Sequence, residues 1–319
     1  MRRRDFIVAF GVVAGWPLMA HAQGETRTIG ILALGNPNPA RFISDFKSQL
    51  AELGYLEGKN LRLEIRSADG QTARLEPLAR ELVAMNVDVL VPYQTPAVAA
   101  AKAATRDIPI VMGSAGDPVG SGFVESFSNP GGNITGVSGG AAELAGKNLE
   151  IIKEIIPSIR RVAFLANQLD PFHKTLMQYF ERAASQLNID AKTELARAGD
   201  DFDRHFVAIK DWGGEAALVQ PNLPLKQVAD SAVRARVPAI SPNEAFTQAG
   251  GLMAYSSDLS SLHRQAATIV DKVLKGRKPA ELPVEMSTKF RLIVNAKAAN
   301  AIGLKLPFLL LTRADEVIE

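Results

Sequence analysis

Short apolar runs and longer amphipathic stretches alternate along the first third of the chain. Four runs have the composition of buried strands, at residues 28–34, 61–65, 87–91 and 108–112. Three stretches between them carry apolar side chains at helical spacing, at residues 40–53, 72–85 and 96–105. Because neighbouring parallel strands are joined by crossover helices, this order predicts a parallel, doubly wound α/β sheet.

The alternation starts again after a turn cluster at residues 129–133. A short strand at 134–138 and a helix at 141–156 lead into a second set of elements. Its predicted strands are at residues 161–166, 189–194, 216–220 and 238–241. Its predicted helices are at residues 173–187, 201–212 and 225–236. The pattern therefore predicts two doubly wound parallel-sheet lobes of the α/β class.

The C-terminal part does not fit two consecutive domains. A strand at 252–256, a helix at 259–274, a strand at 290–294 and a short helix ending at 302 follow the second set. A chain that returns to the first lobe and crosses again joins the lobes by several segments, which is how a hinge is built. We expect lobe 1 to comprise residues 23–138 and 257–285, and lobe 2 to comprise residues 139–256 and 286–319.

The first 22 residues have the layout of a secretory signal peptide. Residues 2–4 are arginines, residues 6–20 carry no charge, and Ala20 and Ala22 place small residues before a cut at Gln23. The adjacent arginines also fit a twin-arginine signal, and Sec export stays open. The apolar stretch is shorter than the about 20 residues that cross a bilayer, so we expect no membrane insertion after cleavage. The signal peptide predicts a periplasmic protein.

Charge and cysteine content narrow the class of partner. The chain has no cysteine, which excludes a cysteine-linked lipid anchor. It has 36 Lys and Arg and 34 Asp and Glu; removing the signal takes away three Arg and one Asp, which leaves 33 of each. A neutral protein has no basic field for nucleic acid or anionic lipid. We expect a monomer that binds a small molecule and has no cofactor.

Several short motifs then occur in an order that resembles a known family. They are 52–60 (ELGYLEGKN), 88–90 (DVL) with 95–97 (TPA), 108–111 (IPIV), 116–119 (GDPV), 130–136 (PGGNITG), 250–253 (GGLM) and 314–319 (ADEVIE). On these residues the chain resembles the ABC-transporter substrate-binding proteins that include tryptophan- and tyrosine-type solute binders. The resemblance implies the type I periplasmic-binding-protein fold, a ligand cleft between the lobes and an ABC permease in the inner membrane as partner.

Polar residues at the strand exits are the candidate ligand-binding residues, because ligands of parallel sheets bind beyond the carboxyl ends of the strands. In the first lobe they are Asn36, Tyr93, Gln94, Thr95, Ser114, Gly116, Asp117 and Ser138. In the second lobe and the return crossover they are Asn167, Gln220, Asn222, Asn243, Glu244 and Asp258.

Some of these residues have two interpretations. Thr95 is a natural N-cap with Pro96 at N1, so the helix that follows can seat a ligand carboxylate or simply be capped. Tyr93 can stack on a flat ligand. Asp117 can bind an ammonium group or cap a turn, and Ser138 and Asp258 can contact the ligand or belong to the hinge.

An enzyme is the main alternative class. Residues 136–140 fit the G-x-S-x-G pattern around Ser138, and His173, His205 and His263 follow it. No oxyanion segment precedes the serine, and there is neither a metal-binding His pair nor a phosphate loop. We therefore expect a binding protein and not an enzyme.

The expected function is solute capture for an ABC importer by hinge closure, with a small carboxylate-bearing solute as ligand. An amino acid or an aromatic acid fits best; branched-chain amino acids and nucleosides stay open, and the few Trp and Tyr residues disfavour a simple sugar. A periplasmic sensor that reports to a receptor would use the same clamp.

Overall fold

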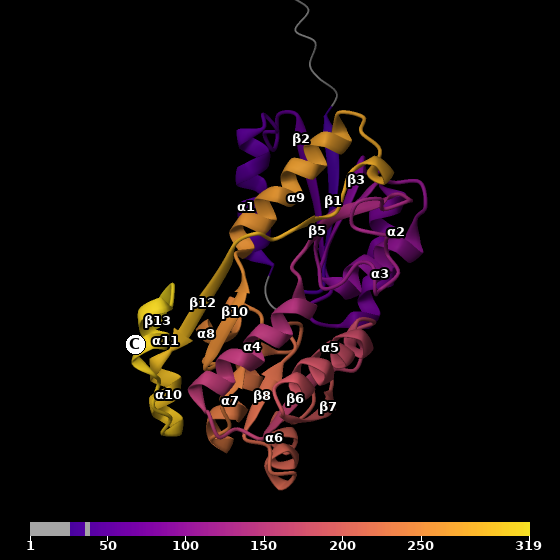
Figure 1. Ribbon diagram of the computed structural model, residues 1–319. Helices are drawn as coiled ribbons and strands as arrows, with labels where there is room; N and C mark the ends of the chain where they lie inside the picture. The colour runs from indigo at the N-terminus through magenta and orange to yellow at the C-terminus, as the bar shows by residue number, and fades with distance from the viewer. Residues whose placement is uncertain (1–25, 36–38) are drawn as a thin grey trace, which may run out of the picture.

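The computed structural model describes residues 26–35 and 39–319 of the chain. The signal peptide expected at residues 1–22 and the candidate residue Asn36 lie outside the described residues. Figure 1 shows two lobes, one above the other, with the β2 end of the first lobe and the α6 end of the second at opposite extremes. Each lobe has its own sheet between layers of helices.

The first lobe is built on a six-stranded sheet in the order β11-β5-β4-β3-β1-β2. Its strands are β1 (Arg27–Ala33), β2 (Leu61–Ser67), β3 (Val89–Tyr93), β4 (Ile110–Ala115), β5 (Ile134–Ser138) and β11 (Glu285–Met286). All neighbouring pairs in this sheet are parallel. The chain thus reaches the edge strand β11 only after it has built most of the second lobe.

Helices cover both faces of the first sheet. On one face α1 (Ala40–Glu52) and α9 (Leu259–Leu274) pack together, and their apolar residues share a core with β1 and β3. On the other face lie α2 (Leu75–Ala84), after the 3₁₀ turn η1 (Thr72–Arg74), and α3 (Thr95–Ala104). The sequence predicted α2 as a single helix with η1, and the structure separates them.

The second lobe has a seven-stranded sheet in the order β13-β12-β10-β9-β8-β6-β7. Its strands are β6 (Arg161–Asn167), β7 (Asp190–Ala196), β8 (Ala216–Val219), β9 (Ala239–Ile240), β10 (Met253–Ser257), β12 (Phe290–Asn295) and β13 (Glu316–Ile318). The pair β10–β12 is antiparallel and the other pairs are parallel. The predicted fold of two doubly wound lobes is confirmed, with this antiparallel pair as its one departure from a purely parallel arrangement of the described strands.

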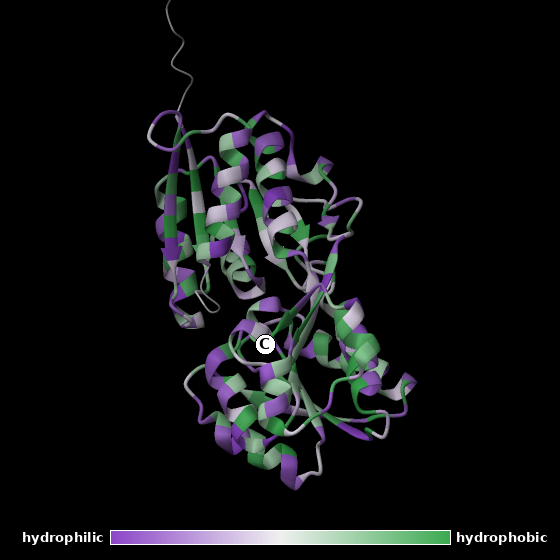
Figure 2. Ribbon diagram, turned by 90° about the vertical axis from the view of Figure 1, so that its left-hand side faces the viewer, coloured by the Kyte–Doolittle hydropathy of each residue, from purple (hydrophilic) through white to green (hydrophobic). Residues whose placement is uncertain are grey.

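Alternation along the strands divides the second core into two halves. Val162, Phe164 and Leu218 face α4 (Ala141–Ile155) and α5 (His173–Gln186). Ala163 and Leu165 face α6 (Phe202–Asp211), α7 (Leu225–Ala235) and the short α8 (Glu244–Gln248). In Figure 2 much of the strands in the middle of each lobe is green, whereas the helices around them carry purple and green bands in alternation. This burial on both faces explains why the strands read as continuous apolar runs.

Three segments connect the lobes. The chain crosses between β5 and α4, between β10 and α9, and between β11 and β12, and it ends in the second lobe with α10 (Ala296–Ile302), α11 (Phe308–Arg313) and β13. A further 3₁₀ turn, η2 (Pro279–Glu281), leads into β11. The residue numbers given above for the lobe boundaries stay a prediction. The predicted return of the chain to the first lobe is observed, because α9 packs on the first sheet and β11 joins it.

Gly136 in β5 occupies a position that no other residue fits. Its φ is +135°, and a Cβ atom built there would lie 2.3 Å from the backbone nitrogen of Met112 in β4. The neighbour is backbone in the middle of a sheet, so it cannot move aside without breaking strand pairing.

We expect Gly136→Ala to lower the free energy of unfolding by at least about 3 kcal/mol, because strain and a backbone clash add up. Gly132→Ala is the matched control: its φ is ordinary and a Cβ atom there would enter open space, so its effect should stay within about 0.5 kcal/mol. Urea denaturation of both variants measures the difference, and equal stabilities would contradict the close approach of β4 and β5.

Candidate functional site

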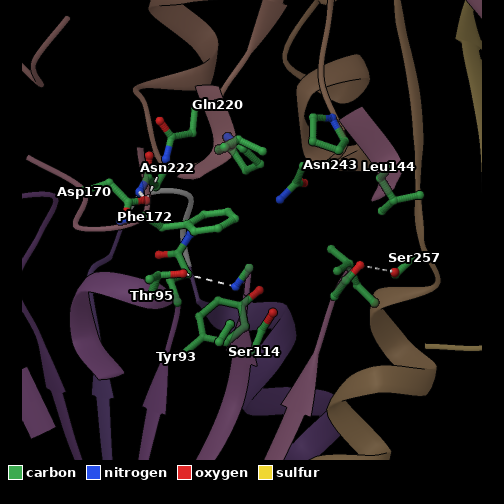
Figure 3. Close-up of a pocket in the computed structure, with 18 residues that line it drawn as sticks. Tyr93, Thr95, Ser114, Leu144, Asp170, Phe172, Gln220, Asn222, Asn243 and Ser257 are labelled. Carbon is green, nitrogen blue, oxygen red and sulfur yellow. Dashed lines mark hydrogen bonds between the residues drawn. The ribbon is translucent and has the colours of Figure 1, made fainter. Parts of the chain in front are cut away.

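A cavity lies between the lobes at the carboxyl ends of both sheets. The space among its lining residues is about 690 Å³ when solvent at its open side is included, and about 100 Å³ of it is open to the centres of water-sized molecules. The first lobe contributes residues 93–95 and 114–116, and the second lobe contributes the loops after β6, β8 and β9 (Figure 3). The cavity is therefore where the polarity of the parallel strands places it.

Asp170 is the charged residue of the cavity wall. It follows β6 by three residues and is 3 % exposed. Its Oδ1 accepts a hydrogen bond from the Phe172 backbone N–H at 2.8 Å, and its Oδ2 accepts bonds from Gln220 Nε2 at 2.7 Å and from Asn222 Nδ2. Burial raises the pKa of Asp170 to about 6, although these three donors act in the opposite direction. A buried carboxylate with fixed neutral donors is suited to receive a cation.

The sequence did not indicate Asp170. Asn167, which was predicted, lies 3 % exposed behind the cavity and supports the cluster. Its backbone N–H donates to Gln220 Oε1 at 2.8 Å, and its Nδ2 donates to Asn222 Oδ1 at 3.3 Å. Asn167 thereby helps to orient the two amides that contact Asp170. Asp170 could have been identified from the sequence as an acidic residue in the loop just after a strand that ends in a polar residue.

Apolar side chains form much of the remaining wall, and Phe172 is the most prominent. The ring of Phe172 lies across the cavity from Tyr93 in Figure 3. It rests on Gly116 of the other lobe, where a Cβ atom would lie 2.6 Å from Phe172 Cε1. Leu144, Leu176 and Leu259 also line the space. The two lobes are therefore in direct contact beside the cavity, and Gly116 permits that contact.

Tyr93 lines the cavity, but one face of its ring is already occupied. Phe42 stacks on it at a centroid distance of 4.4 Å and an angle of 10°. Its hydroxyl lies 3.4 Å from His263 Nε2 beneath the cavity floor, and burial raises the pKa of Tyr93. Stacking on a ligand is thus restricted to the face of Tyr93 that is turned away from Phe42.

The start of α3 differs from the sequence expectation. Thr95 is the first helical residue and not the N-cap, which is Gln94 with φ +76°. Thr95 Oγ1 accepts a hydrogen bond from the Gly116 backbone N–H at 3.1 Å instead of capping the helix. Thr95 as N-cap was therefore wrong, because a tertiary partner competes for its hydroxyl. Within the described part of the chain the buried Gln94 Oε1 has no hydrogen-bond partner, and a positive φ in a non-glycine residue marks a strained position.

The structure brings eight of the predicted residues to the cavity wall. They are Tyr93, Gln94, Thr95, Ser114, Gly116, Gln220, Asn222 and Asn243. Asn243 caps α8 by accepting from the Ala245 N–H at 2.9 Å, and its amide nitrogen points towards the cavity in Figure 3. Their contact with a ligand stays a prediction.

The chain as a whole matches a family model described as ABC transporter substrate binding protein over residues 29–318. The protein belongs to this family. It is 24 % identical over 290 residues to a tyrosine-binding protein of Clostridioides difficile (strain R20291), covering 88 % of this chain and 82 % of that one.

Solved structures agree with the family assignment. The structure of an ABC domain in complex with L-Trp from Streptococcus pneumonia superimposes with a TM-score of 0.86 at 25 % identity, covering 92 % of this chain and 100 % of that one. A conserved domain protein from Vibrio cholerae gives a TM-score of 0.87 at 26 % identity with the same coverage of both chains. The expectation of a substrate-binding protein and not an enzyme is confirmed.

The other predicted residues that the structure of this substrate-binding protein describes do not line the main cavity. Asp117 and Ser138 line a second, neighbouring pocket. Asp117 Oδ1 accepts from the backbone N–H groups of Val119 and Gly120 at 3.1 and 2.9 Å, so it caps a turn as the second interpretation held. Asp258 caps α9 through the Ser261 N–H at 3.2 Å, and Glu244 contacts two arginines.

The environment of Ser138 does not resemble a catalytic serine. Its hydroxyl is fully buried and lies within hydrogen-bond distance of the carbonyl oxygens of Ala115 and Gly116, at 3.2 and 3.3 Å. The histidines that a hydrolase would need contact other groups: His263 contacts Asp45 and Tyr93, and His205 contacts Glu194 and Asp200.

Residues 26–35 and 39–319 contain neither a candidate metal site nor a candidate membrane-spanning helix. No group of three or more His, Asp or Glu side chains there could hold a metal ion. No helix in the same residues is both long and apolar enough to cross a bilayer.

The shifted pKa of Asp170 predicts a pH dependence of stability. The carboxyl titrates near 3.8 when solvated and near 6 in the native state, so the native state binds more protons between these values. The stability contributed by protonated Asp170 is therefore fully present below about pH 4 and is lost as the pH rises through about 6, by roughly 3 kcal/mol in all.

Urea denaturation at pH 4 and pH 7 should show this loss in the wild type and not in Asp170→Asn. The exposed Asp211 gives the matched control, because Asp211→Asn should follow the wild type at both values of pH. If the free energies of unfolding of wild type and Asp170→Asn differ by the same amount at pH 4 and pH 7, the pKa of Asp170 is not raised in the native state.

Proposed function

We propose that the protein is exported to the periplasm and captures an α-amino acid with an apolar or aromatic side chain for import by an ABC permease. The observation that carries the proposal is the charge of the cavity. Among the described residues that line it, Asp170 alone has a side chain that is charged at neutral pH. A ligand ammonium group would complete the cluster of Asp170, Gln220 and Asn222 as its missing cation.

Neutral donors remain for the ligand carboxylate. The amide nitrogen of Asn243 points into the cavity, and the N-terminus of α3 begins at its wall with Thr95. Phe172, Leu176 and Leu144 would then surround the ligand side chain. An aromatic acid without an ammonium group fits less well, because its only charged neighbour would be the carboxylate of Asp170.

The relatives support an amino acid as ligand. One is a tyrosine-binding protein by name, and another was solved with L-Trp in place. In our proposal the ligand docks on one lobe and the other closes over it, so the ligand stabilises the closed form through contacts it makes there. The closed monomer then docks on the permease.

We expect L-tryptophan, L-tyrosine or L-leucine to raise the melting temperature of the chain lacking residues 1–22, whereas benzoate and ribose leave it unchanged. Only a ligand of the native state stabilises it. Asp170→Asn should weaken binding of the amino acid by about 30-fold or more, because an ammonium group would lose its charged partner. Asp211→Asn, which removes an exposed carboxylate, should bind as the wild type does.

Calorimetry provides a second readout of the same assignment. Near pH 6 the free protein carries part of a proton on Asp170, and a bound ammonium group lowers the pKa of that carboxyl. Binding should therefore release protons at pH 5.5 to 6, which appears as a dependence of the heat on the buffer, and release none at pH 8. Binding of benzoate in preference to every amino acid would refute the proposal.

A further inference from the structure

An ion pair crosses the gap between the lobes outside the ligand cavity. Arg41, near the start of α1, donates from Nη1 to Glu244 Oε1 at the start of α8. Of the ion pairs within residues 26–35 and 39–319, this is the one that joins the first lobe to the second. Neither residue lines the main cavity.

Glu244 is held between two guanidinium groups. Its side chain is 1 % exposed, and its second oxygen accepts from Nη1 of Arg291 at 3.1 Å within its own lobe. Glu244 therefore needs both cations while it is buried, since a buried carboxylate is costly unless it is paired. If the lobes separate, Arg41 leaves with the first lobe and water replaces it.

The first lobe holds Arg41 in position for this contact. Its Nη2 donates to Ser260 Oγ at 3.0 Å, and its Nε lies 3.9 Å from Asp45 Oδ2. Ser260 and His263, both on α9, also contact Asp45, at 2.8 and 3.0 Å. The guanidinium is thus preorganised, so little side-chain entropy is lost when Glu244 approaches it.

We infer that Arg41 is a positioning residue that sets ligand affinity without touching the ligand, because its ion pair with Glu244 forms only when the lobes are closed. The inference rests on the proposed capture by hinge closure. A hydrogen bond is lost once its atoms move apart by about an ångström, so rotation of α8 away from α1 breaks it. Every contact that exists only in the closed form raises the closed population and, with it, the apparent affinity.

Ion pairs between exposed side chains usually contribute little to stability. Arg41 is itself 44 % exposed in its side chain, but Glu244 is buried, and the penalty for removing one partner falls on the buried group. That penalty applies to the closed form alone. Arg41→Gln should therefore shift the equilibrium towards the open form.

The first test needs no ligand. Because the chain has no cysteine, labels can be placed on two engineered cysteines at the exposed residues Lys59 and Asp211, one in each lobe. Single-molecule energy transfer on the chain lacking residues 1–22 then reports the closed population. We expect Arg41→Gln to lower this population by about tenfold or more, and Arg41→Lys, which keeps the charge, to restore part of it.

Arg264→Gln is the matched control. Arg264 lies on α9, is 42 % exposed, and pairs with Glu52 of α1 at 2.8 Å inside the first lobe, so its loss should leave the closed population unchanged. In a Glu244→Gln background Arg41→Gln should have no further effect, which shows that the two residues act as a pair. Equal closed populations in wild type and Arg41→Gln would overturn the inference.

The second test uses L-tryptophan as probe and separates the two proposals. Stopped-flow release from Arg41→Gln should be about tenfold or more faster than from wild type or Arg264→Gln. If neither L-tryptophan nor another amino acid binds, the proposed ligand class fails while the energy-transfer result still decides on Arg41. If L-tryptophan binds and its release is unaffected by Arg41→Gln, the role of Arg41 fails while the proposed function stands.

Discussion

The direction of the strands is the constraint on which the site depends. The first sheet is parallel throughout and the second is parallel except for the pair β10–β12, so each delivers the carboxyl ends of most of its strands, and the loops that follow, to the same space. Parallel strands demand helical crossovers, and the helices bury both faces of each sheet. Polar side chains in this protein therefore gather where the strands end, and the walls of the cavity come from loops that the two cores hold rigidly.

One buried carboxylate dominates the electrostatics of that space. Asp170 is satisfied by three neutral donors, which is enough to keep it in place but not enough to offset its burial. The free protein thus retains an unfavourable charge that a cationic group can relieve. The same principle applies at Glu244, where Arg291 of its own lobe and Arg41 of the opposite lobe supply the positive charge.

Most of the fold could be predicted from the sequence, because the spacing of apolar residues indicates which side chains are buried. Strands that are apolar along their whole length are buried on both faces, which is typical of a parallel sheet. The strand exits followed from the same argument, which is why Gln220, Asn222 and Asn243 were found at the wall. Two very short elements were not predicted. The strand β11 has two residues and the helix α8 has five, so neither is long enough to show a hydrophobic period.

The misses within the site have a common physical origin. Asp170 reaches the cavity through a loop whose course depends on Gln220 and Asn222, which are about fifty residues away in sequence. Thr95 has the chemistry of a cap, but Gly116 offers its hydroxyl a better partner. In both cases a tertiary hydrogen bond, invisible in local sequence, decides where a side chain points.

The late return of α9 has a consequence for how the chain acquires its structure. Leu262, Ala266 and Ile269 of α9 complete the core beside β1 and β3, yet they are made more than a hundred residues after β5. Until α9 has been synthesised, this face of the first sheet is covered by α1 alone of the two helices that pack there. Completion of the first lobe therefore waits for contacts between residues far apart in the sequence, and contacts of this kind slow folding.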